Sequence, residues 1–169
     1  ISYKGPSGQQ WGTIFGTSST TSALAGSQSL QMRIYKNQSV TPYTETNFSI
    51  ANAVSVEFKA TYTTTANKIK VQHSLDDGAT WSEGETFTLK TTAATYTYNV
   101  TGDNDNVRFR FSVVNLSVTN TSRVTLDDVV IYAEIQANQV TQPVFTPATG
   151  TKFVDSQTIT ASCETDGAT

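Results

Sequence analysis

Residues 68–81 of this 169-residue chain read KIKVQHSLDDGATW, a pattern that indicates β structure. Apolar and polar side chains alternate from Lys68 to Leu75, which is the two-residue period of a half-buried β-strand. Asp76, Asp77 and Gly78 then supply the residue types that form tight turns. The stretch therefore predicts a strand that ends in a tight turn, as in an antiparallel sheet.

The same alternation recurs at regular spacing along the chain. Turn-forming residues separate the segments, as in the TGDNDN run at 101–106. The opening segment, 5–26, is rich in Gly, Ser and Thr and predicts a loop with one short strand around 11–15. Short strands at this spacing predict an all-β antiparallel sandwich. The expected longer strands cover residues 29–36, 54–62, 68–75, 86–90, 95–100, 107–113 and about 123–135.

The alternation stops near Asn138. The following run, QPVFTPATG at 142–150, has the prolines of a linker that enters a new strand. We therefore expect a β-sandwich over residues 1–138, followed over 139–169 by a linker and the N-terminal fragment of a second β domain.

Composition excludes several classes of partner. The net charge of −3 provides no basic field for nucleic acid or for an anionic membrane surface. No apolar stretch approaches the roughly 18 residues of a spanning helix, so membrane insertion is not expected. Cys163 is the only cysteine and predicts a small buried hydrophobe rather than a reactive thiol. The N-terminus has no signal-peptide pattern, so we expect any export signal to lie upstream or to have been removed.

The residues for common catalytic systems are also scarce. One His and one Cys exclude zinc clusters and Ser-His or Cys-His nucleophile systems. His73 falls on the apolar phase of its strand, which predicts a packed core or rim residue rather than a general base. Two acidic pairs, Asp76 with Asp77 and Asp103 with Asp105, lie in turns, where Asp is a favoured residue. We expect no enzyme activity from this chain.

Three segments carry a resemblance to a known class of domain. They are the SLDDGATW turn at 74–81, the NVRFRF strand at 106–111 and the LDDV segment at 126–129. Together they resemble the jelly-roll modules of secreted bacterial proteins, particularly from Bacteroidota, which include cleaved-adhesin, choice-of-anchor and carbohydrate-binding modules. The resemblance covers about residues 25–135. It implies a jelly-roll fold, a place outside the cell or on its surface, and glycan or cell-surface polysaccharide as partner.

The C-terminal segment carries a second resemblance. The PVF, GT, SQTIT and GAT groups between residues 143 and 169 resemble the start of a chitobiase/hexosaminidase C-terminal-type β domain. That resemblance implies an immunoglobulin-like spacer in a multidomain extracellular protein.

Asp127 and Asp128 stand side by side in an apolar strand, so regular pleating would turn one carboxylate inward. The resemblance to jelly-roll modules implies that an Asp here helps to hold a structural Ca²⁺, with loop oxygens as the other ligands. The alternative is a carboxylate satisfied by Arg or by backbone N–H groups.

A glycan-binding face needs aromatic rings and planar polar side chains. Polar phases of separate strands offer such residues, and they would form one patch if those strands were neighbours in a single sheet. The alternative is a solvated face with cross-strand ion pairs. Trp11, Tyr43 and Trp81 are further candidates for aromatic platforms, although the resemblance implies that Trp81 packs. The predicted ligand-binding residues are Arg33, Tyr35, Lys59, Arg108, Arg110 and Trp11.

The sequence thus predicts a non-catalytic, monomeric carbohydrate-binding or adhesive module of a larger secreted or cell-surface protein. Two alternatives remain at this stage. One is a structural spacer without a ligand, and the other is an accessory domain of a secreted hydrolase.

Overall fold

The computed structural model describes residues 2–4, 8–102, 104–114, 121–134, 144–146, 152, 158 and 160–162. The described residues form strands, turns and loops and include no helix, which confirms the all-β prediction. They accordingly include no helix that is long and apolar enough to span a membrane. The chain divides into one unit over residues 1–135 and another over 136–169.

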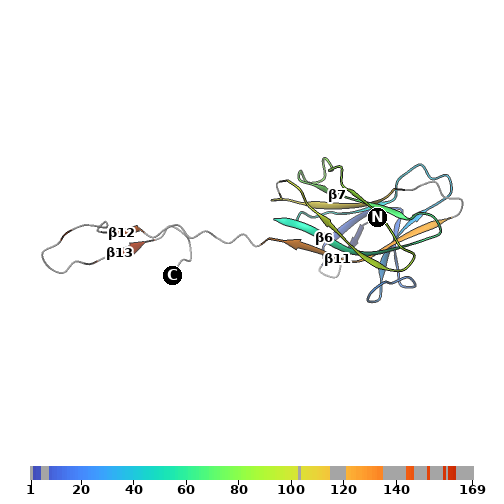
Figure 1. Cartoon of the computed structure of the whole chain (residues 1–169), viewed down its shortest axis with the longest axis horizontal. Coiled ribbons are helices and arrows are strands. Elements are labelled where there is room, and N and C mark those ends of the chain that lie inside the picture. The colour runs from blue at the N-terminus through green and yellow to red at the C-terminus, as the bar shows by residue number, and fades with distance from the viewer. Residues whose placement is uncertain are drawn as a thin grey trace. The chain divides into compact units, whose positions relative to one another are not determined.

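The first unit is an antiparallel sandwich of two sheets (Figure 1). In the six-stranded sheet the order is β1-β2-β5-β10-β7-β8, and in the five-stranded sheet it is β3-β4-β11-β6-β9. The six-stranded sheet consists of β1 (Ser2–Lys4), β2 (Gln10–Ile14), β5 (Tyr43–Thr46), β7 (Lys68–Ser74), β8 (Glu85–Thr88) and β10 (Arg108–Val113). The five-stranded sheet consists of β3 (Gly16–Ser19), β4 (Ser29–Ile34), β6 (Ala53–Thr63), β9 (Ala94–Asn99) and β11 (Ser122–Ala133).

The core lies between the two sheets and is built from the apolar phase of each strand. Phe58 of β6 is fully buried, and its ring packs against Phe87, Tyr96 and Phe111 at centroid distances of 5.6, 5.6 and 5.2 Å. Phe111 comes from the opposite sheet, so these aromatic contacts join the two layers. The polar phases of the same strands are left on the outer faces, where the candidate sites lie.

The predicted turn after β7 is present. Asp77 and Gly78 have φ values of 57° and 88°, and the Ala79 N–H donates to the Asp76 carbonyl at 3.2 Å. Positive φ at both central positions is typical of a type I′ turn, in which Asp-Gly is a favoured pair.

The expectation that Asp127 or Asp128 turns a carboxylate into the core was wrong. Asp127 pairs with Lys59 and Val130 pairs with Glu57, so a β-bulge separates them, and Asp128 has a φ of 45°. The extra residue shifts the phase of β11. As a result Asp127 is half-buried, Asp128 is exposed, and neither residue belongs to the core.

In the second unit, β12 (Val144–Thr146) pairs with β13 (Thr160–Ser162) in antiparallel register. Most of the predicted spacer-like domain, including Cys163, falls outside the described residues. Its resemblance to a chitobiase/hexosaminidase C-terminal-type domain stays a prediction.

Candidate functional site: the outer face of the six-stranded sheet

The six predicted ligand-binding residues do not form one patch. Arg33 lies on β4 and Lys59 on β6, both in the five-stranded sheet, and Tyr35 follows directly after β4. Arg108 and Arg110 lie on β10 and Trp11 on β2, all in the six-stranded sheet. The strands therefore do not meet the condition for a single patch, which was that they be neighbours in one sheet. Alternation assigns a residue to a face of its strand but does not say which sheet the strand joins.

Arg110 is the centre of an ordered group on the outer face of the six-stranded sheet. Its guanidinium lies 4.6 Å from the ring centroid of Tyr43 and 4.0 Å from that of Trp81. It also donates to the Glu45 carboxylate through Nε at 2.7 Å and through Nη2 at 2.5 Å. We name Tyr43, Glu45, Gln72, Trp81 and Arg110 the Arg110 face.

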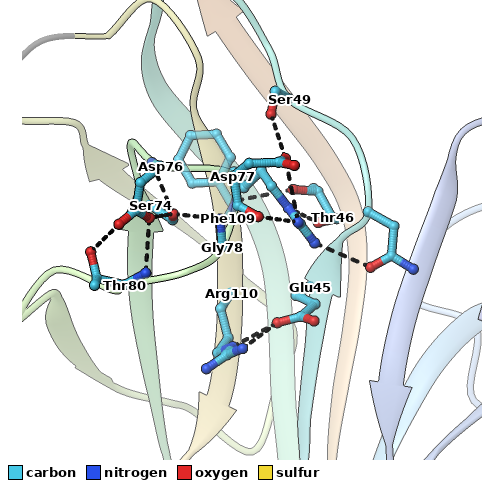
Figure 2. A network of polar contacts seen from close by, with 12 residues as sticks. Glu45, Thr46, Ser49, Ser74, Asp76, Asp77, Gly78, Thr80, Phe109 and Arg110 are labelled. Carbon is cyan, nitrogen blue, oxygen red and sulfur yellow. Dashed lines mark hydrogen bonds and ion pairs between the residues drawn. The ribbon is translucent and has the colours of Figure 1, made fainter.

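Strand register brings these side chains together. Glu45 of β5 and Gln72 of β7 are the partners of Arg110 on either side of β10, so the three residues form one row across the sheet. Figure 2 shows Arg110 and Glu45 directed toward each other from neighbouring strands. The row presents a carboxylate bonded to a guanidinium beside two aromatic rings, and the Gln72 amide in the same row donates to the Ser82 carbonyl at 2.6 Å.

The turn after β7 positions Trp81. Asp76 accepts from the Thr80 N–H at 2.8 Å, from the Thr80 hydroxyl at 2.5 Å and from the Ser74 hydroxyl at 2.7 Å (Figure 2). These hydrogen bonds lower the pKa of Asp76 to about 2. On the far side of Trp81, the Ser82 N–H donates to the His73 carbonyl at 2.8 Å. The loop is therefore tied down on both sides of the ring.

Arg108 is a structural residue of this region. Its Nε donates to the Thr46 carbonyl at 2.7 Å and its Nη1 donates to the Asp77 carbonyl at 2.6 Å. A Cβ added at Gly78 would lie 2.9 Å from Nη1 of Arg108, so the glycine leaves room for the guanidinium as well as for its own positive φ. Arg108 thus clamps the turn onto β5, with most of its donors already in use.

Trp11 lies on the other side of its sheet, where it packs toward Phe48 at 6.0 Å and toward the core residue Phe111 at 6.3 Å. It lines a hollow of about 1040 Å³ together with Lys59, Asp127 and Asp128. The pairing of β11 with β4 ends at Leu126, whereas β11 continues to Ala133 beside β6 alone, and this leaves the hollow open. The structure therefore brings Trp11 close to the predicted metal residues rather than to Arg110.

The contacts of Asp127 and Asp128 do not fit a calcium site. Oδ2 of Asp127 accepts from the N–H groups of Leu24 and Ala25 at 3.0 and 2.8 Å, and Oδ1 accepts from the Asp128 N–H at 2.9 Å. Asp128 instead forms an ion pair with Lys59 at 2.8 Å, which raises the pKa of that amine. The 21–28 loop thus offers N–H donors where a hard cation needs oxygens. Among the described residues, no three His, Cys, Asp or Glu side chains gather as a metal cluster.

His73 is 3% exposed and lies in the core, on the inner face of β7. Its Nδ1 lies 2.6 Å from the Tyr98 hydroxyl and its Nε2 lies 3.1 Å from the Thr101 carbonyl. Because a carbonyl can only accept, Nε2 carries the proton and Nδ1 accepts from Tyr98. Burial lowers the pKa of His73, so the neutral ring is favoured. Both ring nitrogens are engaged in hydrogen bonds within the protein.

Sequence reasoning did not single out Glu45, and it named Tyr43 and Trp81 only as further candidates for aromatic platforms. Glu45 lies on a four-residue strand whose inward residues, Thr44 and Thr46, are fully buried but polar. No apolar alternation marks such a strand. The available signal was the spacing of Tyr43 and Glu45, which places both residues on one face of an extended segment.

No family model matches this sequence, and no curated protein matches it. Solved structures do match the fold. A family 29 carbohydrate-binding module has a TM-score of 0.55 and 16% identity, over 78% of this chain and 83% of that one. The module TmCBM61, solved with beta-1,4-galactotriose, has a TM-score of 0.52 and 13% identity, over 73% and 88%. The K2 cleaved adhesin domain of Lys-gingipain has a TM-score of 0.53 and 12% identity, over 72% and 89%.

These similarities establish the fold. The chain contains a jelly-roll β-sandwich of the kind found in carbohydrate-binding and cleaved-adhesin modules. The resemblance seen in residues 25–135 is confirmed at this level.

Proposed function

We propose that the sandwich is a non-catalytic carbohydrate-binding module and that glycans bind at the Arg110 face. The observation that carries the proposal is the row in which Tyr43 and Trp81 flank the Arg110 guanidinium, with Glu45 and Gln72 beside it. Aromatic rings stack on the C–H surfaces of sugars, and charged or amide side chains bond to the hydroxyls. The fold shared with carbohydrate-binding modules supports the same function.

The site is preorganised, which favours binding. The ion pair with Glu45 and the two ring contacts hold Arg110, and the turn network holds Trp81. Binding would therefore immobilise few additional side chains, so its entropic cost would be low. The rings of Tyr43 and Trp81 are half-buried, so each retains exposed surface.

The proposal that the module is non-catalytic rests on the contacts of its ionisable side chains. Glu45 is committed to Arg110, and His73 is buried with both nitrogens engaged. Glycoside hydrolysis needs two carboxyl groups that face each other across the substrate. The Arg110 face contributes a single carboxylate, Glu45, to such a pair.

We further propose that the module belongs to a secreted or cell-surface bacterial protein and directs it to a glycan. This placement is supported by the fold shared with a cleaved adhesin domain. The spacer alternative predicts a different result in the experiment below.

The test is a glycan-array screen of the purified chain, followed by calorimetric titration of each ligand found. We expect Trp81→Ala and Arg110→Ala to weaken binding about fivefold or more, since stacking on one ring contributes about 1–3 kcal/mol in comparable aromatic contacts. Tyr132→Ala is the matched control, because this exposed aromatic residue lies on the other sheet.

Two results would contradict the proposal. If the chain bound no glycan on the array, the structural spacer without a ligand would be favoured. Binding that Trp11→Ala abolishes and Trp81→Ala leaves unchanged would place the glycan in the Trp11 hollow instead.

A further inference from the structure

A second group of side chains lies at one end of the five-stranded sheet, away from the Arg110 face. Arg33 of β4 and Arg123 of β11 are direct cross-strand partners. The Arg33 N–H donates to the Phe15 carbonyl at 2.9 Å, and the rings of Phe15 and Tyr35 meet edge to face with centroids 6.4 Å apart. We name Phe15, Arg33, Tyr35 and Arg123 the Arg33 patch.

Within the part of the chain that the structure describes, the two guanidinium groups of the Arg33 patch have no acidic partner. Like charges that face each other across a strand pair repel. The ion pairs among the described residues join Lys59 to Asp128, Arg108 to Asp77 and Arg110 to Glu45, so none of them neutralises Arg33 or Arg123. In addition, Nε of Arg33 is buried and has no hydrogen-bond partner within the described part of the chain. A buried donor of this kind is unfavourable unless something accepts from it.

Phe15 adds an independent observation. It has a φ of 55°, a left-handed conformation that a bulky side chain rarely adopts, and it is 44% exposed. It lies where the chain passes from β2 of one sheet to β3 of the other. Glycine would occupy this position without strain. Strained residues that persist in a fold cluster at ligand sites, and here the strain holds an aromatic ring in the solvent.

Tyr35 completes a small aromatic surface beside the charges. It is 43% exposed, and its ring meets that of Phe15. Tyr35 follows Arg33 by two positions, directly after the end of β4. Two exposed rings beside two arginines that have no acidic partner among the described residues match a ligand that is apolar on one face and anionic at one edge.

We propose that the Arg33 patch binds an acidic sugar residue, with its carboxylate or sulfate between the guanidinium groups of Arg33 and Arg123 and its ring against Phe15 or Tyr35. Arg is suited to this contact because its planar fork donates to two oxygens at once. The inference rests on the proposed carbohydrate-binding function and adds a ligand class, acidic polysaccharide. The whole chain carries a net charge of −3, so bulk attraction would not draw it to a polyanion.

The test uses three probes in calorimetric titration: oligogalacturonate for carboxylate, dextran sulfate for sulfate and unmodified dextran as the neutral polymer. We expect one of the two anionic probes to bind, and dextran to bind at least tenfold more weakly. Arg33→Gln and Arg123→Gln should each weaken that binding at least tenfold. Lys68→Gln is the control, because it removes one exposed positive charge from the other sheet and should leave binding unchanged.

Phe15→Gly separates ligand binding from folding. Glycine relieves the positive φ but also removes a ring that is only 44% exposed and its contact with Tyr35, so the melting temperature should change little while affinity for the anionic probe falls. A lower melting temperature with unchanged affinity would show that Phe15 is structural and would overturn its role.

The two proposals can fail separately. Suppose that glycan binding on the array depends on Trp81 and that neither anionic probe binds. This result would contradict the Arg33 patch proposal and would still support the Arg110 face. Anionic binding that survives Arg33→Gln and Arg123→Gln would also overturn the patch. Anionic binding lost in those variants but retained in Trp81→Ala would support the patch independently of the Arg110 face.

Discussion

The single histidine illustrates how one buried residue ties stability to pH. Burial lowers the pKa of His73, so the folded chain resists a proton that the unfolded chain accepts at about pH 6.5. Where the unfolded state binds more protons, stability rises with pH. The stability that His73 contributes is therefore complete above about pH 6.5 and is lost as the pH falls from there toward the lowered pKa of the folded state.

We expect the free energy of unfolding to fall between pH 7.5 and pH 5.5 in denaturant titrations of the natural chain. His73→Gln should be less stable at pH 7.5 but should show a flatter dependence over the same interval. His73 is the only His in the chain, so no other side chain ordinarily titrates in this range. Parallel pH profiles for the two proteins would contradict the assignment.

The same residue shows what alternation can predict. His73, Val71 and Ile69 share the inward phase of β7, and all three are buried, as the pattern indicates. Arg108 and Arg110 also share a face as expected. Their partners could not be predicted, since Glu45 and Asp77 approach β10 from segments far away in the sequence.

At the scale of elements, strands with apolar residues to alternate were predictable, and strands without them were not. The strands β4, β6, β7, β8, β9, β10 and β11 all overlap predicted segments, and β2 overlaps the short strand expected around 11–15. In contrast, β3 reads GTSS and β5 reads YTET, so neither has an apolar phase to detect. These short strands depend on neighbours for their place in a sheet. Without β5, the sequence could not show that Tyr43 and Glu45 stand next to Arg110.

The bulge in β11 is a second feature that alternation hides, and Asp127 anchors it to the loop at 21–28. Asp127→Ala would leave the N–H groups of Leu24 and Ala25 without their acceptor, so we expect a loss of about 1–3 kcal/mol in the free energy of unfolding. Asp128→Asn is the control. It removes only an exposed ion pair and keeps a residue that tolerates positive φ, so its cost should stay below about 1 kcal/mol.

The Asp127→Ala variant also tests the calcium prediction that the sequence raised. Thermal melts with added Ca²⁺ and with EDTA should coincide for the natural chain, because backbone N–H groups already satisfy Asp127. If Ca²⁺ raised the melting temperature of the natural chain but not of Asp127→Ala, the result would support a structural Ca²⁺ bound by Asp127.

At the scale of the whole molecule, the positions of the buried apolar residues show which unit contains the hydrophobic core that stabilises the fold. The buried apolar residues that the structure describes all lie between Met32 and Leu126, within the unit that covers residues 1–135. In the second unit the described residue Val144 is 64% exposed. A unit that contains its own hydrophobic core can fold alone.

We therefore expect residues 1–135, expressed alone, to melt within a few degrees of the full chain and to retain glycan affinity, since both the Arg110 face and the Arg33 patch lie inside this segment. Light scattering after size exclusion should give a monomer for both proteins. The sequence placed the domain boundary at 138 and the structure divides the chain after Ile135, so a protein ending at 138 is the matched control. A shortened chain that is unfolded or that dimerises would mean that the sandwich needs residues from 136–169, and glycan binding would then belong to the two units together.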